Sequence, residues 1–89
     1  MYSIFRTNSF KKQYKKLSST DKELLKEIIV LLAQNQQLDE KYKNHKLTGN
    51  FKDLRECHVK PDLLLIYKIN NDILELALVQ VGSHSSLFK

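Results

Sequence analysis

The sequence predicts an α+β fold in the order β-α-α-β-β-β, a single, mainly antiparallel four-stranded sheet packed against an N-terminal helical hairpin. Two stretches within residues 8–34 repeat their apolar residues at helical spacing, whereas residues 2–7 and 51–81 show strand patterns. The polar triplet Asn70-Asn71-Asp72 separates the last two strand patterns by a tight turn, which favours a hairpin. One sheet backed by two helices is the simplest way to bury both kinds of apolar face.

Residues 2–7 form the first expected strand, because aromatic and β-branched residues alternate there with polar ones. The first helix should begin at Asn8 or Ser9, whose side chains can accept a backbone N–H. Its apolar stripe is narrow and consists of Phe10, Tyr14 and Leu17. The lysines around the stripe fit a solvated helix face or a surface for RNA or an acidic protein equally well: Lys11, Lys12, Lys15 and Lys16.

The second helix should be the main core helix. Thr20 and Glu23 have the spacing of a capping box, and a wide apolar stripe follows from Leu24 to about Gln34. A polar, irregular segment comes next, in which Gly49 is the expected position of a positive φ.

The second strand, residues 51–60, should present two different faces. Arg55, Cys57 and Val59 share one face by alternation, whereas Glu56, His58 and Lys60 share the other. Pro61 ends this strand, because proline has no N–H to donate. Residues 63–69 are almost wholly apolar, as in a central strand, and residues 73–81 form the last one.

Length and composition limit the possible classes of protein. A chain of 89 residues predicts a single domain spanning residues 1–89, and its net charge of +5 predicts attraction to phosphates or to an acidic protein. The single cysteine, Cys57, excludes an internal disulfide and a cysteine metal cluster. The N-terminus lacks a signal-peptide pattern, and the longest apolar run, residues 28–33, is too short to span a membrane. We therefore expect a cytoplasmic protein without a membrane partner.

The three histidines, His45, His58 and His84, lie in polar loops or at strand ends, where an imidazole can act as acid or base near neutral pH. The alternative to a catalytic role is that these are ordinary histidines of the exposed surface. A zinc site is disfavoured, because no pair has the short helical spacing of zinc ligands. A serine or cysteine nucleophile is also disfavoured, since Ser83 and Cys57 each adjoin a histidine that alternation directs to the opposite face.

Cleavage of RNA without a metal or other cofactor remains the best match to these residues. The reaction needs a base for the 2′-OH, an acid for the leaving 5′-oxygen and cations around the phosphate. The candidate acids and bases are His45, His58, Asp62 and His84, with candidate cations at Lys52, Arg55 and Lys60.

Three motifs at combined spacing resemble one family of proteins. They are His45-x-Leu47-x-Gly49, Arg55-x-x-His58-Val59-x-Pro61-Asp62-x-x-Leu65-Ile66-Tyr67 and Gly82-Ser83-His84-x-x-Leu87-Phe88. This pattern resembles the YafQ branch of the RelE/ParE toxin superfamily, and the expected order of elements extends the resemblance to the whole chain.

The resemblance implies the toxin half of a type II toxin–antitoxin system, an endoribonuclease that cleaves mRNA in the ribosomal A site without a metal. An acidic antitoxin of the DinJ or RelB type would silence it, and operator DNA would be contacted only through that complex. The resemblance also assigns acid–base work and substrate contacts to His45, His58, Asp62 and His84, and mRNA binding to Phe88, which can stack on a base.

The chain departs from the family pattern at two positions. Gln80 replaces an arginine that steadies the transition-state phosphate, and Leu63 replaces an aromatic residue found in some members. A neutral amide donates hydrogen bonds without charge, so Arg55 or Lys52 would have to compensate. Two alternatives therefore stay open, a ParE-like toxin that acts by binding a protein, and a weakened toxin that mainly binds its antitoxin and operator DNA.

Overall fold

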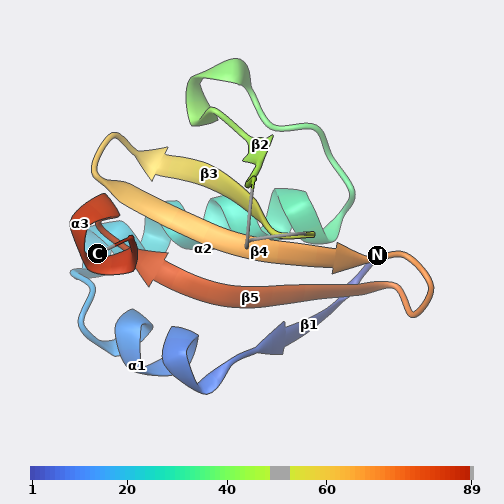
Figure 1. Cartoon of the computed structure of the whole chain (residues 1–89), viewed down its shortest axis with the longest axis horizontal. Coiled ribbons are helices and arrows are strands. Elements are labelled where there is room, and N and C mark those ends of the chain that lie inside the picture. Colours follow the sequence, from blue (N-terminus) through green and yellow to red (C-terminus); the bar gives the residue numbers. More distant parts are fainter. Residues whose placement is uncertain (49–52, 89) are drawn as a thin grey trace.

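A five-stranded sheet in the order β1-β5-β4-β3-β2 forms the frame of the molecule (Figure 1). The computed structural model describes residues 1–48 and 53–88, so the expectations for Gly49 and Lys52 lie outside the described residues. The strands are β1 (Ser3–Arg6), β2 (His45–Lys46), β3 (Arg55–Lys60), β4 (Leu63–Asn70) and β5 (Glu75–Gly82). The helices are α1 (Asn8–Lys15), α2 (Ser19–Ala33), the 3₁₀ helix η1 (Glu40–Tyr42) and α3 (His84–Leu87).

The predicted α+β class and element order are confirmed, but the prediction of four strands was wrong by one. The additional strand, β2, is two polar residues long and pairs antiparallel with β3, His45 opposite Glu56 and Lys46 opposite Arg55. So short a segment carries no periodicity of its own, and only its partner defines it. The sheet is mixed, because β1 runs parallel to β5 while the other pairs are antiparallel.

α1 begins at Asn8, as predicted, but its capping residue lies one position earlier, and α2 begins before the predicted cap at Thr20. The Thr7 side chain accepts from the backbone N–H of Phe10, so Thr7 caps α1. Ser18 caps α2 by accepting from the N–H of Asp21, and its carbonyl already accepts from Lys22. The capping box at Thr20 was therefore wrong, since the serine two residues earlier satisfies the free N–H groups first.

The core lies between α2, behind the strands in Figure 1, and one face of the sheet. Leu25, Ile28 and Leu32 of α2 join a cluster of buried side chains that includes Cys57 and Leu65. Burial raises the pKa of the Cys57 thiol to about 12, which keeps it neutral and unreactive. Cys57 is thus a core residue, as predicted.

The opposite face of β4 is also buried. Leu64 and Ile66 are almost fully covered, yet they do not belong to the cluster on the α2 side. The prediction of a central strand that is apolar on both faces is therefore confirmed.

Two irregularities of register change which side chains share a face. In β3, His58 pairs with Leu64 but Lys60 pairs with Leu63, so Val59 is the additional residue of a bulge. The bulge turns Lys60 to the α2 side, where its Nζ lies 2.9 Å from Asp21 Oδ1. The expectation that Lys60 shares a face with His58 was wrong for this reason.

The second irregularity lies in β5. Ile66 pairs with Gln80, whereas Tyr67 pairs with Leu78, which leaves Val79 as the additional residue. A regular strand would place Leu78 and Gln80 on the same face. With the bulge, Leu78 lies in the core and Gln80 turns to the face opposite α2.

In the described part of the chain, no helix combines the length and the apolar character needed to cross a membrane.

Candidate active site

A buried carboxylate between two histidines lies on the sheet face opposite α2. Glu56 and His58 are two residues apart on β3 and so share this face, while His45 lies directly opposite Glu56 on β2. Glu56 Oε1 lies 3.2 Å from His58 Nε2, and Glu56 Oε2 lies 4.0 Å from His45 Nε2. Glu56 is only 6% exposed, whereas the side chains of His58 and His45 are 22% and 52% exposed.

The burial of Glu56 explains why its carboxylate lies between the two histidine rings. A buried carboxylate is costly unless it accepts hydrogen bonds or faces positive charge. Both histidines present Nε2 to it, so the carboxylate orients two imidazole rings. Glu56 is therefore the organising residue of this cluster, although it belongs to no catalytic motif in the sequence.

Hydrogen bonds also determine which nitrogen of each ring can exchange a proton. His45 Nδ1 lies 2.7 Å from the carbonyl oxygen of Lys43, which can only accept, so Nδ1 carries the hydrogen. Neutral His45 thus has its lone pair on Nε2, the nitrogen that faces Glu56. His58 donates from Nε2 to Glu56, which leaves its Nδ1 as the lone-pair nitrogen in the neutral ring.

The C-terminal helix α3 lies on the same face as this cluster. Gly82 is opposite Leu64, which in turn is opposite His58, so the three positions form one row across the sheet. A Cβ atom on Gly82 would point to this face and would meet Ser86 Oγ at 2.8 Å and Leu87 Cδ2 at 3.3 Å. The helix thus packs against Gly82 on the side of His58, roughly 10 Å away across two strand spacings.

Ser83 caps α3 by accepting from the N–H of Ser86 at 3.2 Å. His84 is the first residue of this helix and Phe88 follows its last residue. Their rings lie 5.0 Å apart between centroids at an interplanar angle of 42°. His84 is exposed, so an imidazole and an aromatic ring stand together beside the row of His58.

Asp62 is exposed in the turn between β3 and β4. Because the beginning of β4 pairs with the end of β5, this turn lies at the same end of the sheet as α3 (Figure 1). The structure therefore places Asp62 at the same end of the sheet as His58, Gly82 and α3, and His45 on the strand beyond Glu56.

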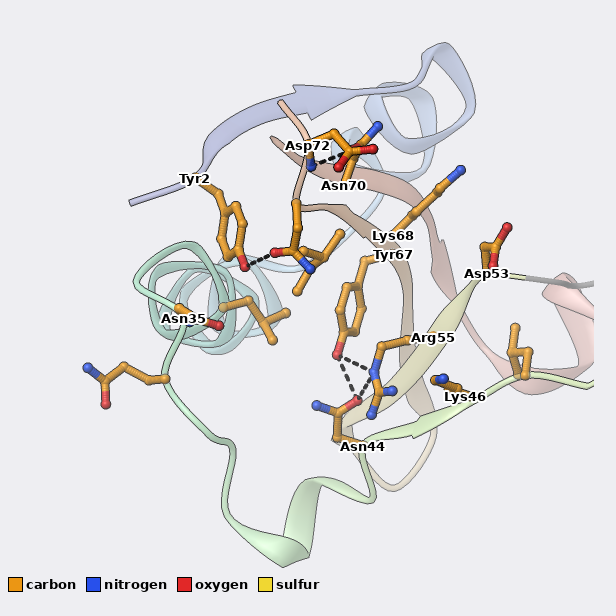
Figure 2. A pocket seen from close by; sticks show the side chains of 15 residues that line it. Tyr2, Asn35, Asn44, Lys46, Asp53, Arg55, Tyr67, Lys68, Asn70 and Asp72 are labelled. Atoms are coloured by element: carbon orange, nitrogen blue, oxygen red, sulfur yellow. Dashed lines mark hydrogen bonds between the residues drawn. The ribbon is translucent and has the colours of Figure 1, made fainter. Parts of the chain in front are cut away.

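Arg55 lies apart from these residues, on the α2 side of β3. Its Nε donates to Asn44 Oδ1 and to the Tyr67 hydroxyl, both at 3.3 Å, and that hydroxyl donates to Asn44 at 2.7 Å. Burial raises the pKa of Tyr67, while the hydrogen bond from Arg55 acts in the opposite direction. This network lines an open pocket of about 980 Å³ (Figure 2). Alternation along β3 already indicated this separation of Arg55 from His58.

The remaining predicted cations are dispersed. Lys60 is paired with Asp21, which raises its pKa chiefly through their hydrogen bond. The lysines of the first helical segment are all exposed: Lys11, Lys12, Lys15 and Lys16. The sheet face opposite α2, which carries His45, Glu56 and His58, is called the histidine face below. Of the polar candidates for contact with a phosphate, Gln80 is the one that the described structure brings to this face, in the row His45–Glu56–Ile66–Gln80.

The comparisons with known proteins agree with this fold. A sequence model described as the bacterial toxin of type II toxin–antitoxin system, YafQ, matches residues 2–89. The mRNA interferase toxin YafQ of Escherichia coli strain K12 is 39% identical over 69 residues, which cover 76% of this chain and 73% of that protein.

Solved structures match over the full length. The crystal structure of a metal-bound toxin from Helicobacter pylori has a TM-score of 0.88 and 43% identity, covering 99% of this chain and 100% of that one. The Escherichia coli DinJ–YafQ complex matches with a TM-score of 0.85 and 31% identity, covering 100% of both chains. Across residues 1–48 and 53–88 of this chain, no three or more His, Cys, Asp or Glu side chains are arranged to hold a metal ion.

The fold and its match to these solved structures thus define a toxin of the RelE-like class. Within that class, the chain belongs to the YafQ family of type II toxin–antitoxin systems.

Proposed function

We propose that residues 1–89 form one toxin domain that cleaves mRNA in the ribosomal A site and thereby stops translation. The observation that carries this proposal is the cluster His45–Glu56–His58, which presents two oriented imidazoles on an open sheet face. The names of the relatives support the same activity, since two of them are called mRNA interferase toxins. The place of action would be the cytoplasm, where ribosomes and mRNA meet.

The proposed reaction is an internal transfer at phosphorus. A base removes the proton of the ribose 2′-OH, the 2′-oxygen attacks phosphorus, and the bond to the 5′-oxygen breaks as an acid protonates that oxygen. His45 suits the base, because its Nδ1 is held by the Lys43 carbonyl and its Nε2 therefore carries the lone pair in the neutral ring. His84 suits the acid, because it is exposed on α3, which packs beside Gly82 on the same face of the sheet. These side chains supply both proton transfers without a metal.

The other predicted residues would bind rather than exchange protons. His58, held by Glu56, would stabilise the charged phosphate, and Asp62 would contact the substrate from its turn. Phe88 would stack on a base beside His84.

The partner that silences the toxin would be an acidic antitoxin of the DinJ or RelB type. The net charge of +5 suits an acidic protein, and a related toxin has been crystallised in a DinJ–YafQ complex. Operator DNA would then be contacted only through the antitoxin complex.

Primer extension on a reporter mRNA tests the activity. We expect new 5′ ends in the coding region when the protein and translating ribosomes are both present, and none when ribosomes are left out. Growth arrest without any new 5′ end would instead favour a ParE-like toxin that binds a protein target.

Gly82→Ala should lower the cleavage rate by about tenfold to a hundredfold, because small displacements of catalytic groups have effects of this size. The added Cβ would lie 2.8 Å from Ser86 Oγ and 3.3 Å from Leu87 Cδ2, so these side chains must move, and the Ser86 hydroxyl would lose its hydrogen bond to the Ser83 carbonyl in the helix that carries His84. Cleavage rates and melting temperatures should be measured together.

The matched control is the double variant Gly82→Ala/Ser86→Ala, which removes the oxygen that makes the closest contact. We expect it to regain part of the activity relative to Gly82→Ala alone. Equal activity of Gly82→Ala and the parent would show that the position of α3 does not matter.

A further inference from the structure

Gln13 of α1 joins two consecutive residues of β5 through its side-chain amide. Its Oε1 accepts from the backbone N–H of Val81 at 2.8 Å, and its Nε2 donates to Gln80 Oε1 at 3.2 Å. The paired part of β1 ends opposite Leu78, so Val81 lies beyond the reach of that edge strand. Gln13 therefore supplies the hydrogen-bond acceptor that a neighbouring strand would otherwise offer to the Val81 N–H.

The backbone determines the orientation of both amides. A backbone N–H can only donate, so the atom of Gln13 that faces Val81 must be the oxygen. The nitrogen of Gln13 must then face Gln80, and a nitrogen donor requires an oxygen acceptor. Gln80 is consequently held with its Oε1 toward α1, and the two N–H donors of its Nε2 remain for other partners.

Gln80 lies where such donors can reach a substrate. The bulge at Val79 turns its side chain to the histidine face, in one row with Ile66, Glu56 and His45. Gln80 is partly exposed and lies roughly 10 Å from Glu56 across two strand spacings. A phosphate above Ile66 would therefore have the carboxylate-bound histidines on one side and an amide donor on the other.

We propose that Gln13 is a positioning residue that holds the Gln80 amide with its NH₂ group toward the RNA phosphate. This inference rests on the proposed function and names the group that stabilises the phosphate where the family has an arginine. The amide supplies no charge, but a donor held in advance loses little orientational freedom when the transition state forms.

Gln13→Glu tests the proposal, because it changes one NH₂ group to an oxygen and leaves the shape of the side chain unchanged. One carboxylate oxygen still accepts from Val81, but the other can no longer donate to Gln80. The Gln80 amide then turns its NH₂ toward residue 13 and its oxygen toward the substrate. We expect a loss of kcat of about a hundredfold, the lower end of the roughly 10²–10³-fold loss seen when a single oxyanion donor is removed, with an unchanged melting temperature.

A double-mutant cycle with Gln80→Met separates positioning from simple charge repulsion. Methionine has a similar length but no donor, so Gln80→Met should lose activity by itself. If Gln13 acts through Gln80, Gln13→Glu causes little further loss in the Gln80→Met background. A full additional loss there would overturn the proposal, since the new carboxylate would then act directly on the RNA.

Two further variants complete the test. Gln37→Glu adds the same charge at an exposed loop position and should keep parental activity. Gln13→Glu/Gln80→Arg should regain activity, because arginine can donate to the carboxylate and still present N–H groups to the phosphate. Parental cleavage by Gln13→Glu would reject the positioning role while leaving the proposed function intact.

The hydrogen bond between Gln13 and Gln80 can also be tested by a measurement that does not depend on mRNA cleavage. The Gln13 NH₂ protons, which donate to Gln80, should exchange with solvent more slowly in the parent than in Gln80→Met by NMR. Equal exchange in the two proteins would show that the bridge does not form.

Discussion

His58→Gln is expected to lower the rate of mRNA cleavage by roughly 10²–10³-fold, the usual loss when one group that stabilises the charge of the transition state is removed. Glutamine can still donate to Glu56, which His58 approaches at 3.2 Å, so the buried carboxylate keeps a partner and the fold is retained. It cannot become positively charged beside the phosphate. Single-turnover cleavage of ribosome-bound reporter mRNA measures the loss, and growth arrest on expression should disappear with it.

His84→Ala should cause a loss of similar size, since it removes the proposed acid from an exposed position on α3. Lys46→Gln is the matched control, because Lys46 is exposed on β2 beside His45 but alternates to the other face. The catalytic reading would be wrong if His58→Gln and His84→Ala both cleaved mRNA as fast as the parent. Glu56→Gln should fall between the parent and His58→Gln, because it removes the charged partner that orients both imidazole rings.

Leu65→Ala is expected to reduce the free energy of unfolding by about 2–5 kcal/mol, the cost of removing a large side chain from a packed core. Leu65 is 0% exposed and lies at the middle of the sheet, paired with Cys57 on one side and Val81 on the other. A domain of this size has a total stability of about 5–15 kcal/mol, and each kcal/mol lost lowers the melting temperature by about 4–8 °C. Thermal unfolding followed by circular dichroism measures the shift.

Ile73→Ala is the control for Leu65→Ala. Ile73 is 61% exposed within the turn between β4 and β5, so its truncation should change stability by no more than about 0.5 kcal/mol. Equal melting temperatures for the two variants would contradict the assignment of β4 as the central strand.

The α+β class followed from the sequence because its strongest signals are local. The apolar stripe from Leu24 onward needs only helical geometry to be recognised, and residues 63–69 need only their almost wholly apolar character. The sequence did not indicate β2, because His45 and Lys46 form a strand only through their pairing with Glu56 and Arg55 of β3. The short helix α3 was likewise read as a closing loop, since one turn of serines has no periodicity.

The candidate site was predicted in part. The spacing of His45, His58 and His84 and their polar surroundings identified them as candidates before any contact was known. Glu56 was placed on the face of His58 by alternation, but its role required the pairing of β2 with β3. That pairing joins residues eleven positions apart, which no local pattern encodes.

By itself, then, the sequence determined the class of fold, the central strand and the histidines, because helical and strand periodicities and residue chemistry are properties of short segments. Only the tertiary structure decided which side chains meet. The bulge at Val59 turned Lys60 toward Asp21, and the bulge at Val79 turned Gln80 toward the histidine face. A bulge inserts one residue against a partner strand and reverses the alternation beyond it, so its position depends on how two distant segments align.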